Sequence, residues 1–183
     1  MRHHPTTLTS VAHRGYSLVE LMAVIAMIAI MAALAVAGYR RYLQWTKTAE
    51  GKDLVGAIAA GQIRYFEDTE GYLDCSDTMT DYYPGAPNTQ KRTFRDTGNP
   101  KHVCWDLLGI DSQTPTYFGF VTMAGLPSDA PPNLPTTGTF TPEAGRPWFI
   151  VMGVSNIDDD ATLGYLSTTS FAPGDIAIVN EDE

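Results

Sequence analysis

The stretch Arg14-Gly15-Tyr16-Ser17-Leu18-Val19-Glu20 leads directly into an apolar run at residues 21–37, and this junction decides how the chain is organised. The seventeen residues of this run, which follows Glu20, carry no charge. As a helix of roughly 1.5 Å per residue, residues 16–37 would be about 33 Å long, enough to cross a hydrocarbon core of about 30 Å. An Asp at the centre of such a helix costs roughly 2.5–3.5 kcal/mol, and a Glu near one end somewhat less. The sequence therefore predicts a membrane-spanning helix whose acid needs a partner.

The junction resembles the N-terminus of type IV prepilins, the precursors of type IV pilins and of the pseudopilins of type II secretion, from residue 14 to about residue 42. The resemblance implies that residues 1–15 are a leader, that prepilin peptidase cuts between Gly15 and Tyr16, and that Tyr16 is then N-methylated. It also implies that the Glu20 carboxylate pairs with the Tyr16 amine of a neighbouring subunit. Because opposite charges attract strongly at low dielectric, assembly satisfies the acid that insertion left unpaired. Tyr16 stands where the family more often has Phe.

An ordinary membrane anchor, an ordinary secretory signal and a buried core helix are the alternatives for this segment, and the length of the apolar run disfavours the core helix. A secretory signal has its cleavage site after the apolar run, whereas here the best-placed cleavage signal precedes it. Arg40 and Arg41 follow the run, so local charge does not orient the helix. Since a large acidic C-terminal region translocates largely regardless of charge, we expect the leader in the cytoplasm and the residues from about Arg40 onward outside.

The chain is strongly acidic, with 12 basic and 21 acidic side chains and a formal net charge of −9. Removal of the leader takes away Arg2 and Arg14, which leaves ten basic residues against twenty-one acids, a charge of −11. Such a surface disfavours direct binding to duplex nucleic acid, which needs clustered Lys and Arg. One local basic group, Arg40, Arg41 and Lys47, lies where we expect the helix to meet lipid headgroups or the acids of a neighbour.

The expected first helix covers residues 16–70, with its transmembrane and assembly part at 16–37. Pilins commonly have Pro where this chain has Ala37, so we expect a straighter helix here, although Gly38 keeps some flexibility. Gly71 is suited to a left-handed cap at the end of the helix. Past Ala37 the pattern becomes amphipathic, and a stripe at spacings of three and four predicts the face that packs on a sheet. The stripe comprises Leu54, Val55, Ile58, Gln62, Ile63 and Phe66.

β-Branched and aromatic runs bounded by Gly and Pro predict four strands, at residues 116–123, 147–154, 162–169 and 175–179. The last two linkers are short enough for antiparallel hairpins. The predicted fold class is α+β: a long helical spine, apolar in its first half and amphipathic in its second, packed on an antiparallel sheet of about four strands. This is also the pilin architecture. Residues 71–115 are then a helix-to-sheet loop region, and residues 116–183 form the sheet head.

Cys75 and Cys104 lie in the predicted loop region between helix and sheet. Because a translocated head is in an oxidising compartment, we expect an intramolecular disulfide. Closing a loop of about thirty residues stabilises the fold by roughly 3.5 kcal/mol on the chain-entropy estimate. Residues 76–103 have few aliphatic side chains to bury, so this region depends on the cross-link. Many pilins carry their disulfide nearer the C-terminus.

Catalytic chemistry has few candidate residues. His102 is the only histidine that remains after leader removal, and nothing near it has the spacing of a catalytic triad or of a metal site. We therefore expect no enzymatic activity and no cofactor. The one exception is an acidic turn whose clustered oxygens suit Ca²⁺, although a solvated turn explains it equally well. Its candidate ligands are Asn156, Asp158, Asp159 and Asp160.

The sequence thus predicts a structural type IV pilin that polymerises with copies of itself or related pilins into a helical surface filament. Its expected partners are prepilin peptidase/methyltransferase, the inner-membrane assembly platform and, before assembly, the membrane. We expect a single-pass precursor in the inner membrane and then an extracellular pilus of a bacterial cell. Two alternatives stay open: a pseudopilin of a type II secretion pseudopilus, favoured by calcium in the 156–160 turn, and a membrane-anchored periplasmic binding domain.

Overall fold

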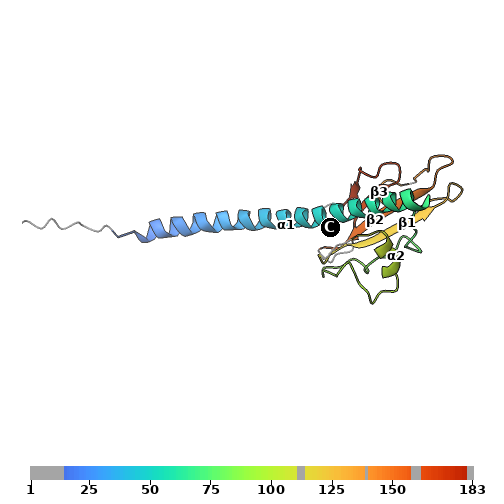
Figure 1. Cartoon of the computed structure of the whole chain (residues 1–183). Helices are drawn as coiled ribbons and strands as arrows, with labels where there is room; N and C mark the ends of the chain where they lie inside the picture. The colour runs from blue at the N-terminus through green and yellow to red at the C-terminus, as the bar shows by residue number, and fades with distance from the viewer. Residues whose placement is uncertain (1–14, 111–113, 139, 158–161, 181–183) are drawn as a thin grey trace, which may run out of the picture. The chain divides into compact units, whose positions relative to one another are not determined.

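The computed structural model describes residues 15–110, 114–138, 140–157 and 162–180. The predicted α+β class is confirmed, because a long N-terminal helix is packed with a four-stranded antiparallel sheet. The chain divides into one unit that ends at Arg40 and a second unit that begins at Arg41. The elements are α1 (Leu18–Thr69), α2 (His102–Leu107), β1 (Gly119–Gly125), β2 (Trp148–Ser155), β3 (Gly164–Thr169) and β4 (Ala177–Val179) (Figure 1).

The first unit contains the apolar part of α1. Each residue from 15 to 40 is exposed to solvent in the single chain. Alanine, methionine and leucine, all strong helix formers, are frequent in this segment. The helix continues through Ala37 and Gly38, as a segment without proline allows.

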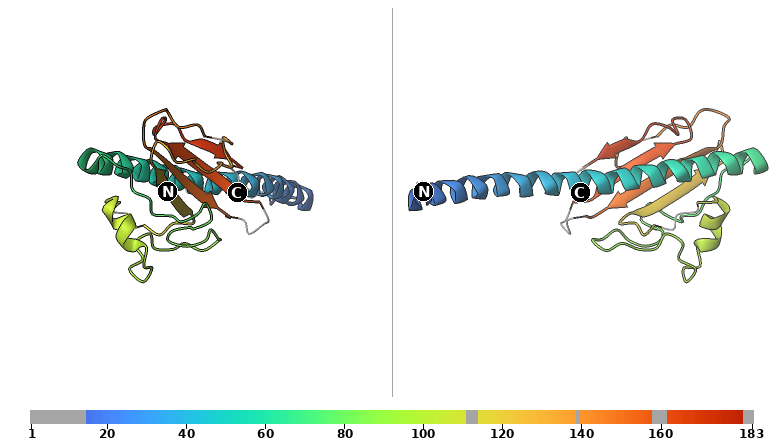
Figure 2. Two further views of the ribbon diagram at one scale, coloured as in Figure 1. Left: turned by 90° about the vertical axis from the view of Figure 1, so that its right-hand side faces the viewer. Right: turned by 60° about the vertical axis from the view of Figure 1, so that its left-hand side comes forward.

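In the second unit, one face of α1 packs on the sheet, and Figure 2 shows the helix running across the strands. Small residues occupy more of this face than the sequence pattern predicts. A Cβ added at Gly51 would lie 2.5 Å from the Phe118 ring and 2.7 Å from Leu166, so glycine allows the close approach. Ile63 is 37% exposed, and its predicted place in the packed stripe is wrong. The buried residues are Thr48, Gly51, Val55, Ile58, Ala59, Gly61 and Gln62.

Gln62 connects α1 to two other segments of the head. Its side chain is fully buried. The amide Nε2 donates to the Leu73 carbonyl at 2.6 Å and to Thr122 Oγ1 at 2.8 Å, while Oε1 accepts from the Leu73 N–H at 2.9 Å. Both ends of this buried amide are therefore satisfied, as burial of a polar group requires.

α1 ends one residue earlier than predicted. Glu70, and not Gly71, adopts the left-handed conformation, with φ 62°. Its N–H donates to the Phe66 carbonyl at 2.8 Å, and Thr69 Oγ1 donates to the Tyr65 carbonyl at 2.7 Å. These bonds close the last turn before the chain reaches Gly71, so the predicted glycine cap is wrong.

The sheet has the order β1-β2-β3-β4, with every neighbouring pair antiparallel. β2 is buried along its whole length because both of its faces are covered. Phe149 and Val151 belong to the main core that includes Val55 and Ile58 of α1. Alternate residues point to the opposite face of a strand, and there Ile150 packs with Trp148 and Leu134.

The predicted strands are present but begin one to three residues later than expected. The largest shift is at β1, which starts at Gly119 instead of residue 116. Thr116 pairs with Arg92 in an isolated bridge, and its Oγ1 accepts a hydrogen bond from the Phe118 N–H at 3.1 Å. This local bond bends the chain before the ladder with β2 begins, an effect that strand propensity does not reveal.

The two outer strands of the sheet differ in how their free edges are arranged. The outer edge of β1 is paired with the segment that follows α1: Thr122 O accepts from the N–H groups of Cys75 and Ser76, and Phe120 exchanges two bonds with Tyr83. β4, at the other edge, has only three residues.

The region 71–115, predicted as a loop with a disulfide, contains the cross-link and also a short helix, α2. Cys75 and Cys104 are joined, with their Cα atoms 5.6 Å apart. Aromatic side chains supply the core that aliphatic ones do not: the Trp105 ring stacks on Tyr83 with centroids 4.8 Å apart, and Phe94 packs edge-on against both. The region therefore has a short helix and an aromatic core in addition to the predicted cross-link.

Candidate assembly site

The start of α1 is closed by a pair of reciprocal hydrogen bonds between Ser17 and Glu20. Ser17 Oγ accepts from the Glu20 N–H at 3.2 Å, and the Ser17 N–H donates to Glu20 Oε2 at 2.8 Å. This capping box satisfies two backbone donors that a helix N-terminus otherwise leaves unpaired. The carboxylate also lies in the first turn, where the helix dipole favours a negative charge.

Ser17 is a residue that sequence reasoning missed. A Ser followed three residues later by Glu is a recognised signal for a helix start, and it is present in the printed sequence. The lone charge in an apolar segment draws attention to pairing between subunits instead. The local bond leaves both Tyr16 and Glu20 exposed, so they are accessible to another molecule.

The apolar part of α1 has no contact that shields it within its own unit. Within the described ranges, α1 is the one helix long and apolar enough to cross a membrane. Burial of a large apolar side chain contributes about 1.5–3 kcal/mol, so this surface needs lipid or other helices around it. Its exposed large side chains include Leu18, Leu21, Ile25, Ile28, Ile30, Met31 and Leu34.

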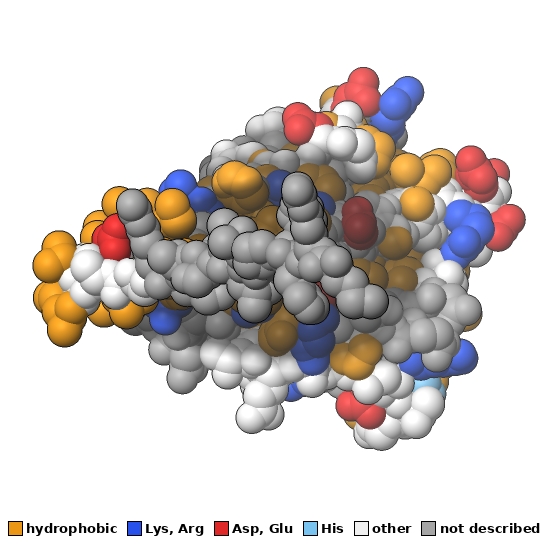
Figure 3. All heavy atoms as spheres, turned by 90° about the vertical axis from the view of Figure 1, so that its left-hand side faces the viewer, with side chains coloured by type: hydrophobic (Ala, Val, Ile, Leu, Met, Phe, Trp, Pro, Cys, Tyr) orange, Lys and Arg blue, Asp and Glu red, His pale blue; other side chains and the backbone are white. Residues whose placement is uncertain are grey.

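Lys47 and Lys91, which lie far apart in the sequence, meet at Tyr117. Their Nζ atoms are 4.7 and 4.8 Å from the centroid of the tyrosine ring. Lys91 also forms an ion pair with Glu50 at 2.7 Å. Sequence reasoning placed only Lys47 in a basic group, because tertiary folding alone brings Lys91 beside it. Figure 3 shows basic side chains next to hydrophobic ones on the face that it presents.

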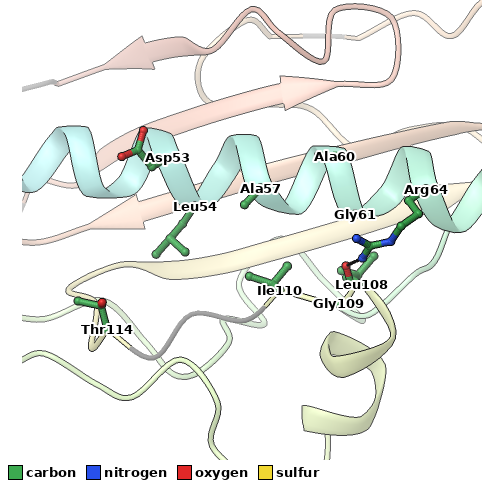
Figure 4. Close-up of a pocket in the computed structure, with 10 residues that line it drawn as sticks. All are labelled: Asp53, Leu54, Ala57, Ala60, Gly61, Arg64, Leu108, Gly109, Ile110 and Thr114. Atoms are coloured by element: carbon green, nitrogen blue, oxygen red, sulfur yellow. Dashed lines mark hydrogen bonds between the residues drawn. The ribbon is translucent and has the colours of Figure 1, made fainter.

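An open groove of about 610 Å³ lies between α1 and the segment after α2 (Figure 4). Leu54 and Ile110 contribute apolar surface from its two sides, and small residues of α1 lie between them. Arg64 closes one end by donating a hydrogen bond to the Leu108 carbonyl. Among the described residues that line the groove, Asp53 is the one acid and none is a histidine or cysteine.

His102 and Cys104 do not form the pair that a Cys-His reaction requires. The Cys104 sulfur is part of the disulfide, and His102 Nδ1 lies 2.8 Å from the Asn99 carbonyl oxygen. Burial raises the pKa of the Tyr72, Tyr82 and Tyr83 hydroxyls and of the Asp74 carboxyl. All four groups are explained by packing in the head.

The predicted calcium turn lies largely outside the part of the chain that the structure describes. Asn156 is described, whereas Asp158, Asp159 and Asp160 are outside the described residues. Among the residues that are described, no three His, Cys, Asp or Glu side chains are grouped to hold a metal ion. Calcium binding therefore stays a prediction.

Comparison with known proteins gives one positive finding. Residues 11–36 match the family model of the prokaryotic N-terminal methylation motif. The chain carries the type IV prepilin-type signature. Comparisons with curated proteins and with solved structures found no match. The signature covers the junction between Arg14 and the apolar run, and the head lies outside the matched residues.

The prepilin-type signature indicates the general class of protein to which the exposed apolar helix belongs. It supports a pilin- or pseudopilin-like substrate of prepilin peptidase, made as a membrane-anchored precursor and assembled into pilin-type polymers. It marks a structural type of protein, a class that is usually not enzymatic. The matched range contains Gly15, Tyr16, Ser17 and Glu20, whose individual roles stay predictions.

Proposed function

We propose that this protein is a structural subunit of a type IV pilus, cut between Gly15 and Tyr16, N-methylated on Tyr16 and polymerised into an extracellular filament. The observation that carries the proposal is an apolar half-helix, exposed from residue 15 to 40, with a single carboxylate in its first turn. A surface of this kind is stable in lipid and again among identical helices, but not in water. The prepilin-type signature on the same residues supports it.

In the proposed mechanism, Glu20 acts twice. In the membrane its carboxylate accepts a hydrogen bond from the Ser17 N–H, which gives the acid one hydrogen-bond partner within its own helix. In the filament it meets the Tyr16 amine of a neighbouring subunit, a full charge that outweighs a neutral N–H as a partner. Prepilin peptidase/methyltransferase creates that amine, and the inner-membrane assembly platform brings the subunits together.

A pair of variants separates the two roles of the start of α1. Glu20→Ala removes the counter-charge and the acceptor of the Ser17 N–H, whereas Ser17→Ala removes the hydroxyl that accepts the Glu20 N–H and keeps the carboxylate. We expect Glu20→Ala to insert and be processed but to yield few or no fibres, and Ser17→Ala to yield fibres. Electron microscopy of cells, with immunoblots for processing, measures both. Abundant normal fibres from Glu20→Ala would refute the pairing role.

Processing is tested on the fibre itself. Mass spectrometry of subunits from purified filaments should find methyl-tyrosine at the N-terminus. A bulky replacement at Gly15 should hinder cleavage and leave precursor in the membrane. If subunits in filaments retain residues 1–15, the chain is not a pilin of this kind, and an intact anchored precursor with no filament would favour the membrane-anchored domain.

A further inference from the structure

The convergence of Lys47 and Lys91 on Tyr117 gathers two positive charges in the head. Both ammonium groups lie within 5 Å of one ring centroid, where the ring's negative face attracts them. Glu50 pairs with Lys91 and offsets one of the two charges. Both ammonium groups are thus held at one ring, and the described ion pairs give them one acid, Glu50 at Lys91, so an added anion would stabilise the cluster.

Side chains typical of a membrane interface lie just before this cluster in the chain. Arg41, Tyr42 and Trp45 are exposed, the two aromatic side chains by 63% and 56%. They follow the apolar run in sequence, so the backbone itself brings them to the point where α1 leaves the hydrocarbon. Tyr and Trp are enriched at that depth, and Lys and Arg there attract anionic lipids.

The cluster is also unusual for its sign. The mature chain has a formal charge of −11, so an anionic bilayer repels the head as a whole. Of the four lysines in the chain, two are in this cluster, and a third, Lys52, follows on α1. The head therefore has a small positive area in an otherwise acidic protein, and two of its members, Arg41 and Lys47, follow the apolar run closely in the sequence.

We propose that Arg41, Lys47 and Lys91 form a docking surface for the phosphate groups of anionic phospholipids, which seats the head on the bilayer before assembly. Lipid phosphates accept hydrogen bonds from the ammonium groups and supply the negative charge that Glu50 alone does not. Lipid is favoured over the acids of a neighbouring subunit because the aromatic flank and the chain's exit from the apolar segment place this surface at the headgroups. The inference goes beyond the proposed polymer and rests on its membrane-inserted precursor.

Amine footprinting of the full chain tests the proposal without any mutation. The protein is reconstituted in lipid nanodiscs of phosphatidylcholine, alone or mixed with phosphatidylglycerol, and acetylation at each lysine is followed by mass spectrometry. We expect the rates at Lys47 and Lys91 to fall about 5-fold each in the anionic discs and to recover in high salt. Lys101, which is bound to Asp77 and Asp81, is the internal reference and should not change.

Two outcomes would overturn the inference. Equal rates at Lys47 and Lys91 in both lipids would mean that phosphate does not dock there. Protection that follows the protein-to-lipid ratio, and not lipid charge, would assign the surface to a second copy of the chain. Failure of the chain to insert into either disc would instead contradict the membrane-anchored precursor in the proposed function.

Variants test whether protection depends on the arrangement of the two lysines at the Tyr117 ring or only on the number of charges. Tyr117→Leu removes the ring that holds both ammonium groups and keeps every charge, so lipid-dependent protection of Lys47 and Lys91 should weaken. Arg146→Gln, at an exposed arginine paired with Glu143, removes one charge elsewhere and should leave the protection unchanged. If near-UV circular dichroism shows that Tyr117→Leu loses its fold, Lys91→Gln serves instead, with weaker protection of Lys47 as the expected result and unchanged protection as the contrary one.

Discussion

The two parts of α1 are one helix by secondary structure, yet they are stabilised in opposite ways. From Gly15 to Arg40 every described side chain is exposed. From Thr48 to Gln62 the same helix buries seven residues against its own head. The second half of α1 is therefore stabilised by packing within the chain, whereas the first half can bury its apolar side chains only against lipid or other molecules. Changes in the second half should therefore alter unfolding, and changes in the first half should alter insertion and assembly.

The largest expected effect on the self-contained part comes from the disulfide. Replacing Cys75 and Cys104 by Ser frees a loop with a sequence separation of 29 residues, which should cost about 3.5 kcal/mol. Urea unfolding of the detergent-solubilised protein, followed by fluorescence of the buried Trp105 and Trp148, measures the loss. Far-UV helicity of the apolar half should persist past the transition of the head, and loss of both signals together would show that the two parts are not independent.

Gln62→Leu should be the next most damaging change. It leaves the Leu73 N–H and carbonyl and the Thr122 hydroxyl without their shared partner, at about 2–3 kcal/mol. The neighbouring Ile63→Gln, at a side chain that is 37% exposed, is the matched control and should stay within about 0.5 kcal/mol of the parent. The unfolding midpoint in urea compares them. Equal midpoints for both variants would mean that the buried amide does not connect α1 to the head.

Alanine substitutions at two glycines of α1 should change the stability of the head by smaller amounts and in opposite directions. Gly51→Ala pushes a methyl group against the Phe118 ring and Leu166 and should destabilise the head by about 1–3 kcal/mol. Gly56→Ala meets nothing within 4 Å and should stabilise it by about 0.5–1 kcal/mol through helix propensity. Thermal melts of the two variants should move in opposite directions. A shift of the same sign in both would show that close packing at Gly51 is not what sets the stability.

Asp74→Asn should have the smallest effect, and its sign depends on pH. Burial raises the pKa of the Asp74 carboxyl above its ordinary value of 3.8, so the folded state binds this proton more tightly than the unfolded state does. The associated stability is present below pH 3.8 and is lost as pH rises through the raised pKa. At neutral pH the Asn variant should be more stable by a few tenths of a kcal/mol, since water screens a partly exposed group. If the stability gained by the Asn variant over the parent grew toward low pH, this assignment would be contradicted.

The sequence predicts the parts of the structure that depend on long or periodic patterns. The helix, the four strands and their antiparallel order follow from hydrophobic periodicity and from short linkers. Local hydrogen bonds at Thr116 and Thr69 set the actual boundaries, and propensity does not contain them. α2 escapes prediction because its six residues are fixed by the disulfide and by stacking of Trp105 on Tyr83.

The candidate site divides in the same way. Gly15, Tyr16 and Glu20 are visible as a local pattern, and Ser17 is too, once the capping spacing is considered. The role of Gly51 cannot be predicted in this way, because glycine has a low helix propensity and its benefit depends on the Phe118 ring that packs against it. Nor can the roles of Lys91 and Tyr117, since they reach Lys47 only through the tertiary fold.

The covered edge of β1 has a consequence for the proposed filament, in which copies of the chain would lie side by side. Unprotected strand edges join across molecules and lead to amyloid-like stacking. Here residues 75–83 occupy one edge and the other is only three residues long. Growth by edge-to-edge strand addition is thereby discouraged, so in the proposed filament the exposed apolar helices are the surfaces available to join subunits.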